Sequence, residues 1–105
     1  MSANPLDVYS EFDPKVIESY NRLQDLVFSE GVLPQKFKVL IAMAIDVEYG
    51  ALQGATALSR RALKLGATKD EIIETLRVSY YVGGNRALFT SAQVLQNLFK
   101  QDQKL

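Results

Sequence analysis

Helix start and stop signals recur along this chain at short intervals, and they limit its fold more than any other feature. Asp13-Pro14 places an N-capping carboxylate before the proline that the first helical turn favours. Thr68-x-x-Glu71 forms a capping box ahead of an apolar run. Glycines typical of helix ends or breaks separate the segments: Gly31, Gly50, Gly66 and Gly83-Gly84. These signals predict an all-α fold.

Apolar residues between these signals repeat at spacings of three and four, as on one face of a helix. The clearest series is Ala51, Ala55, Leu58, Ala62 and Leu65. No strand-like alternation and no linker divides the chain, so we expect one domain over residues 1–105. The series predict about five helices, near residues 14–30, 34–49, 51–65, 69–82 and 86–100. Residues 1–11 would form an extended or frayed arm, and residues 101–105 a frayed tail.

Two of the expected helices carry more apolar residues than one small bundle can cover. Residues 40–45 are apolar without a break, and a helix that is apolar on all sides is expected to be buried on all sides. The apolar residues between 72 and 82 cannot all share one helix face. We therefore expect self-association into a homo-oligomer, although scattered exposed apolar side chains remain the alternative.

The chain contains neither cysteine nor histidine. Without cysteine it has no disulfide, no thiolate nucleophile and no redox couple. Without histidine it lacks the commonest general base and the commonest zinc ligand, so Ser–His and Cys–His hydrolase sites are excluded. A metal site made only of carboxylates stays open in principle, but no motif indicates one, and we expect no metal and no cofactor.

Charge and hydropathy limit the partners. Twelve basic and twelve acidic residues give zero net charge, so the chain lacks the basic field that attracts nucleic acid. The longest apolar run, residues 39–45, is too short to cross a bilayer, and the first residues lack the pattern of a secretory signal. We expect a cytoplasmic protein with no nucleic-acid or membrane partner.

Three stretches resemble, in order and spacing, the carboxymuconolactone decarboxylase / alkylhydroperoxidase D-like family. Residues 31–44 (GVLPQKFKVLIAMA) are similar to the loop and helix before its active site. Residues 62–72 are similar to its Gly-Ala-Thr turn and following helix, and residues 82–87 to its glycine-rich break. The likeness covers residues 12–98 and implies an all-α family fold that assembles as trimers or hexamers.

The resemblance also implies where an active site would lie. Peroxide-reducing members place a Cys-x-x-Cys pair at the start of the third helix, a histidine one turn later and a relay glutamate on the preceding helix. The cysteine positions fall on Ala51 and Gly54, the histidine position on Leu58 and the glutamate position on Val39. Every reactive side chain is therefore replaced, and we expect no thiol-dependent peroxide reduction. Arg86 takes the place of a proline common in the family's glycine-rich break.

Other polar residues could line the same region. Asp46 lies seven residues after Val39 and shares its helix face, so it could bind a polar ligand. The further candidates for ligand binding are Glu48, Tyr49, Arg61, Tyr81 and Arg86. Each has a structural alternative: a solvated helix end for the acids, packing for the tyrosines and an exposed surface position for the arginines.

Two functional hypotheses follow. In the first, the chain is a non-catalytic, oligomeric family member whose former active site is packed shut or binds a small ligand. In the second, it is an enzyme of altered chemistry, of decarboxylase or lactone type, that acts on a small carboxylated substrate through Arg86, Asp46 and a tyrosine. A subunit that acts only beside a catalytic paralogue is a third option.

Overall fold

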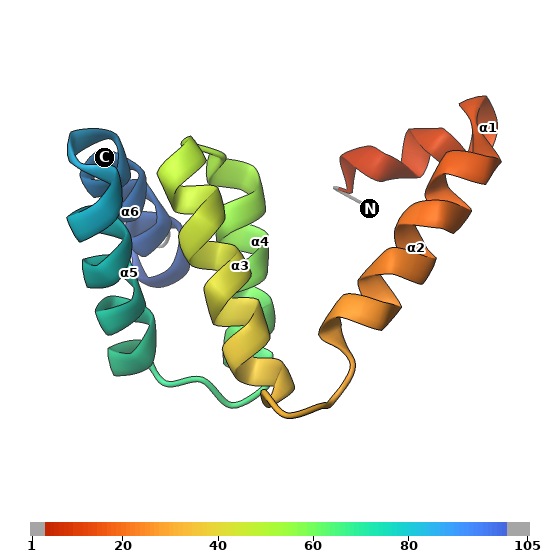
Figure 1. Cartoon of the computed structure of the whole chain (residues 1–105). Helices are drawn as coiled ribbons and strands as arrows, with labels where there is room; N and C mark the ends of the chain where they lie inside the picture. Colours follow the sequence, from red (N-terminus) through yellow and green to blue (C-terminus); the bar gives the residue numbers. More distant parts are fainter. Residues whose placement is uncertain (1–3, 101–105) are drawn as a thin grey trace.

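The computed structural model describes residues 4–100, and every regular element within them is helical. A 3₁₀ turn η1 (Pro5–Val8) is followed by six α-helices: α1 (Tyr9–Phe12), α2 (Pro14–Phe28), α3 (Gln35–Tyr49), α4 (Leu52–Lys64), α5 (Lys69–Gly83) and α6 (Asn85–Phe99). Helices α3 to α6 pack against one another as a bundle, while α2 leans away from it (Figure 1). The all-α prediction is confirmed.

The predicted caps form as expected. The Asp13 side chain accepts a hydrogen bond from the Val16 N–H at 3.3 Å and starts α2. Thr68 and Glu71 exchange reciprocal hydrogen bonds of 3.0 Å, which completes the capping box of α5. Gly50 closes α3 in the left-handed conformation, with φ of 75°. These helix ends are encoded locally, which is why the sequence alone places them.

Residues 5–11 form helical turns, where the sequence predicted an extended or frayed arm over residues 1–11. The Asn4 side chain accepts a hydrogen bond from the Leu6 N–H at 2.9 Å and, with Pro5, starts a helical turn. Helical turns continue to Phe12, so the described chain has six α-helices where about five were expected. Residues 1–3 and the predicted frayed tail, 101–105, lie outside the described part.

Gly31 does not end α2 as the sequence suggested. The helix stops at Phe28, because Ser29 turns into an extended conformation with ψ of 156°. The connection to α3 is held by two hydrogen bonds. Lys38 Nζ donates to the Ser29 carbonyl at 2.8 Å, and the Gln35 N–H donates to Glu30 Oε2 at 3.4 Å.

The core lies inside the α3–α6 bundle. Its fully buried apolar side chains come from all four helices: Val39, Met43, Val47, Ala55, Ala62, Ile72, Ala87 and Val94. The Ser79 hydroxyl of α5 donates to the Ala44 carbonyl of α3 at 2.9 Å, so this buried polar group is satisfied across the helix pair.

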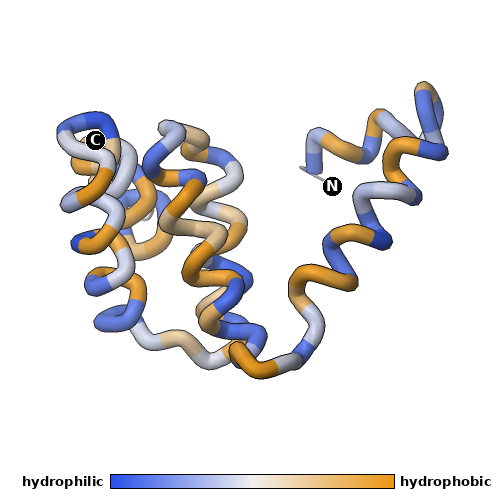
Figure 2. The backbone as a smooth tube through the Cα atoms, viewed as in Figure 1, coloured by the Kyte–Doolittle hydropathy of each residue, from blue (hydrophilic) through white to orange (hydrophobic). Residues whose placement is uncertain are grey.

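The expectation that α3 is buried on all sides is wrong within the single chain. Ile41 and Ile45 are 50% and 49% exposed, because none of the helices within residues 4–100 covers that side. Helix α2 contains no buried residue at all. Figure 2 shows hydrophobic positions recurring along α2, which stands apart from the bundle. Between residues 4 and 100, no helix combines the length and hydropathy needed to cross a membrane.

Candidate functional site

The junction between α3 and α4 brings one acidic side chain against the start of a helix. The Ala51 N–H donates to the Asp46 carbonyl at 2.8 Å, which ties the turn together. The Asp46 carboxylate lies against Gly54 in the first turn of α4. Its Oδ2 is so close to the Gly54 backbone that a Cβ at this position would clash with it. Gly54 has an ordinary helical backbone, and its lack of a side chain is explained by this contact.

The Asp46 carboxylate has no hydrogen-bond or ion-pair partner within residues 4–100. Burial raises the pKa of the Asp46 carboxyl above its ordinary value, because a partly desolvated carboxylate is less stable in its charged form. An unpartnered, partly buried acid can bind a polar group of a ligand or transfer a proton. Asp46 is therefore the strongest of the candidates named from the sequence.

The raised pKa of Asp46 gives a testable dependence of stability on pH. Below about pH 4 the carboxyl is neutral in both the folded and the unfolded chain. As the pH rises towards the pKa of Asp46 in the folded chain, ionisation of this carboxyl lowers the free energy of unfolding. Above that pKa the loss of stability stays constant. Asp46→Asn is therefore expected to raise the melting temperature at pH 7 but not at pH 3. Thermal unfolding by circular dichroism measures this.

Asp25→Asn is the matched control for that experiment, since it removes one carboxylate from the exposed α2. A melting-temperature gain for Asp46→Asn that is equal at pH 3 and pH 7 would contradict the burial of the charge.

Arg86 and Glu48 meet on the other side of the same junction. Arg86 Nε donates to the Glu48 carbonyl at 3.0 Å, and the Arg86 side chain packs along Gly50. A cation that binds a terminal carbonyl stabilises the C-terminal end of a helix. The structure thus places Arg86 as a cap of α3, with part of its hydrogen-bonding capacity used inside the protein.

The remaining candidates from the sequence are two exposed tyrosines and Arg61. Tyr49 and Tyr81 are 74% and 89% exposed. Arg61 lies near the far end of α4, where its guanidinium stacks over the Phe28 ring at 4.6 Å from the ring centroid. This contact attaches the end of α2 to the bundle.

The four positions of the family's reactive residues have different environments. Val39 is fully buried in the core, and Leu58 packs against that core. Ala51 is exposed, and Gly54 borders a cleft beside α4. Val39 lies about 10 Å before Asp46 along α3, at 1.5 Å per residue. Val39 and Leu58 are thus part of the core packing, while the surface near Gly54 is open to solvent.

That cleft, about 800 Å³ in volume, was not predicted from the sequence. It lies between the first helical turns, α2 and α4. Its polar lining includes Asn21 and Gln24 of α2, Gln53, Thr56 and Arg60 of α4, and Asn97 of α6. Asn97 Nδ2 donates to Thr56 Oγ1 at 3.2 Å, and Arg60 Nη2 donates to the Asn97 carbonyl at 3.3 Å. The spacing of Gln53, Thr56 and Arg60 was the signal available in the sequence, since it places them on one helix face.

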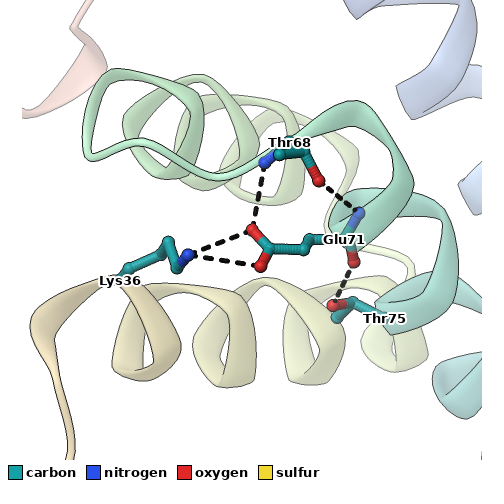
Figure 3. Close-up of polar contacts among 4 residues, drawn as sticks. All are labelled: Lys36, Thr68, Glu71 and Thr75. Atoms are coloured by element: carbon teal, nitrogen blue, oxygen red, sulfur yellow. Dashed lines mark hydrogen bonds and ion pairs between the residues drawn. The ribbon is translucent and has the colours of Figure 1, made fainter.

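A polar network joins the starts of α3 and α5 (Figure 3). Lys36 Nζ lies 3.2 Å from each oxygen of the Glu71 carboxylate. The hydrogen bond from the Thr68 N–H, followed by the contact with Lys36, holds the pKa of Glu71 below its ordinary value. This network contributes to the packing of α5 on α3. Across the described helices, no three acidic side chains come close enough together to hold a metal ion.

Comparison with known proteins places these features in a family. The sequence profile of the carboxymuconolactone decarboxylase family matches residues 14–97. The fold is similar to the crystal structure of apo-lpg0406, a carboxymuconolactone decarboxylase family protein from Legionella pneumophila, with a TM-score of 0.84 and 30% sequence identity. That match covers 94% of this chain and 88% of the other.

A curated relative also matches most of the chain. The sequence is 27% identical over 90 residues to the uncharacterized protein MJ1511 of Methanocaldococcus jannaschii, covering 86% of this chain and 83% of the relative. The profile match spans most of the helices described above, from the start of α2 to the last turn of α6. This chain belongs to the carboxymuconolactone decarboxylase family.

Proposed function

We propose that this chain is a self-associating family member that binds a small ligand and does not reduce peroxides through thiol chemistry. The observation that carries the proposal is the complete absence of cysteine and histidine from the sequence. Thiol-dependent peroxide reduction needs a thiolate, and a protein side chain can supply one only from cysteine. The family positions that resemblance assigns to the relay hold Val39, Ala51, Gly54 and Leu58 instead.

The cleft beside α4 supports the ligand-binding part of the proposal. Ligand sites combine apolar walls with a few polar groups that fix orientation. Here Leu6, Ile17 and Leu52 supply apolar surface, while Gln53 and Asn97 supply carboxamide groups. A small molecule with an apolar body and a hydrogen-bonding group fits this lining.

Unburied apolar surface supports the self-association part. Helix α2 and one side of α3 leave large apolar side chains 43–72% exposed within the single chain. Contiguous apolar surface of this kind is typical of protein interfaces. Resemblance to the family makes a trimer or hexamer the expected stoichiometry.

The activity test uses tert-butyl hydroperoxide with dithiothreitol as the reductant. We expect consumption of the peroxide at the rate of a protein-free blank, because the chain offers no sulfur nucleophile. A thiol peroxidase serves as the positive control for the assay. Saturable, protein-dependent turnover would overturn the proposal.

The same proposal is tested for binding with benzoate, whose ring and carboxylate match the apolar and polar parts of the lining. Calorimetric titration is expected to give saturable binding, weakened about fivefold by Gln53→Ala through loss of one hydrogen bond. Gln93→Ala is the matched control, since Gln93 is exposed on α6. Equal weakening by both variants would contradict binding in this cleft.

Asp46 favours a second candidate, an enzyme of altered chemistry. An unpartnered acid with a raised pKa is suited to proton transfer in a decarboxylation or lactone reaction. Arg86 is less suited to it, because its Nε already caps α3. Turnover of γ-carboxymuconolactone that Asp46→Asn abolishes, with the fold intact by circular dichroism, would establish this candidate over the first.

A further inference from the structure

The cleft beside α4 lies between one face of α2 and one face of α4 (Figure 1). The residues that α2 contributes have the spacing of a single helix face: Ile17, Tyr20, Asn21 and Gln24. On α4 the same spacing relates Gln53, Thr56, Ala57 and Arg60. The Arg61 guanidinium of α4 stacks over the Phe28 ring of α2, so the two walls are joined directly. The cleft is therefore formed within the single chain before any ligand binds.

Neutral amide groups make up most of the polar lining of this cleft. Five lining residues carry a carboxamide: Asn4, Asn21, Gln24, Gln53 and Asn97. Among the described lining residues none is acidic, and the one charged side chain is Arg60, whose Nη2 donates to the Asn97 carbonyl at 3.3 Å. An anionic ligand would thus meet a single cation that the protein already engages. An uncharged ligand meets several groups that can both donate and accept hydrogen bonds.

Three of the five carboxamides are not used by the fold. Those of Asn4 and Asn97 take part in hydrogen bonds within the chain. Those of Asn21, Gln24 and Gln53 form no hydrogen bond with any residue between 4 and 100. Asn21 and Gln53 are exposed, but Gln24 is half-buried. Because water reaches Gln24 only in part, its carboxamide gains the most from a ligand that pairs with both its oxygen and its nitrogen.

A lactam ring matches this lining better than other small uncharged molecules do. A lactam carries an N–H and a carbonyl side by side in one plane, and a glutamine carboxamide presents the complementary pair, so two parallel hydrogen bonds form. The flat faces of such a ring suit the Tyr20 side chain and the apolar walls of Ile17 and Leu52. A polyol has hydroxyls around its whole rim, and these apolar side chains would leave some of them without a partner.

We propose that this cleft binds a flat, uncharged ring with a lactam edge, held by the Gln24 carboxamide and stacked against Tyr20. The inference rests on the ligand binding proposed above and specifies the chemical class of the ligand. Gln53, on the opposite wall, donates to the second lone pair of the lactam carbonyl. The volume of about 800 Å³ lies within the range of pockets for small molecules, so a bicyclic ring fits beside these side chains.

The probe is quinolin-2(1H)-one, a bicyclic lactam, and the matched ligand is its N-methyl derivative, in which a methyl group replaces the lactam hydrogen. Calorimetric titration of the unmodified protein is expected to give saturable binding of the lactam, about tenfold tighter than that of the derivative. Gln24→Leu keeps the size of the side chain and removes both amide groups. We expect it to weaken binding of the lactam about tenfold and to change that of the derivative by less than about threefold. Gln93→Leu, at an exposed position of α6 outside the cleft, should change neither affinity.

Titration with benzoate separates the possible failures. Binding of benzoate without a preference for the lactam over its derivative would overturn this inference and leave the proposed ligand binding standing. A preference that survives Gln24→Leu would overturn the inference too, because Gln24 would not hold the lactam edge. An equal loss of all three ligands in Gln24→Leu would do the same, since the variant would act on the whole cleft. No saturable binding of benzoate, the lactam or the derivative would overturn both this inference and the ligand binding on which it rests.

Discussion

Ile72→Ala is expected to lower the free energy of unfolding by about 2–5 kcal/mol, the cost of removing a large buried side chain from a packed core. Ile72 is fully buried in the first turn of α5, directly after the capping box. The bundle cannot close the resulting cavity without moving α5, which its cap and the Lys36 contact hold on α3. Urea denaturation at one fixed protein concentration measures the loss.

Ile73→Ala is the matched control, since it removes the same atoms from the adjacent position of the same helix. Ile73 is only partly buried, so its truncation is expected to cost clearly less than that of Ile72. Equal losses for the two variants would mean that the side of α5 facing the core has been assigned incorrectly.

The sequence predicts the helices well where their ends are encoded locally. Asp13 and the Thr68–Glu71 box each form their cap within three residues of sequence, so no distant contact is needed to place them. The same reasoning missed the helical turn at Pro5, because its signal, a single asparagine and proline, is weak in a short segment. It also extended α2 to Gly31, although the chain leaves the helix at Ser29.

The placement of α2 could not be predicted from the sequence. Its apolar spacing predicts a buried face, but periodicity does not tell whether the covering surface belongs to the same chain. The same limit applies to Ile41 and Ile45 of α3, which were expected to be buried and are half exposed. In the self-association proposed above, these residues form the contact between copies, and a single-chain interpretation assigns them to the core.

The candidate site was predicted in part. Asp46 was named as a candidate, but its contact with Gly54 depends on how α3 and α4 pair, which is a property of tertiary packing. Arg86 was named as a ligand-binding candidate, and its contact with the end of α3 through Nε likewise depends on tertiary packing. Tyr49 and Tyr81, named with Asp46 as candidates, are largely exposed at the ends of α3 and α5.

Gly83→Ala is expected to lower the free energy of unfolding by about 1–3 kcal/mol through overpacking. An alanine inside a helix normally gains about 1 kcal/mol over glycine, so the expected sign is the reverse of the intrinsic preference. A Cβ at Gly83 would lie 2.9 Å from the Ala87 Cβ and 3.1 Å from the Glu48 Cγ. The Ala87 Cβ cannot move without its backbone, so α6 would have to shift relative to α3 and α5.

Two further variants decide whether packing is the cause. Gly31→Ala places a methyl group where the nearest non-neighbouring atom is Lys38 Nζ at 3.7 Å, so it is expected to change the unfolding free energy by less than about 0.5 kcal/mol. Ala87→Gly in the Gly83→Ala background removes the methyl group that the new Cβ meets. A double-mutant cycle should then show a favourable coupling of about 1 kcal/mol or more between the two positions. Strictly additive effects would contradict the close approach of α5 and α6, and with it the geometry that brings Arg86 onto the end of α3.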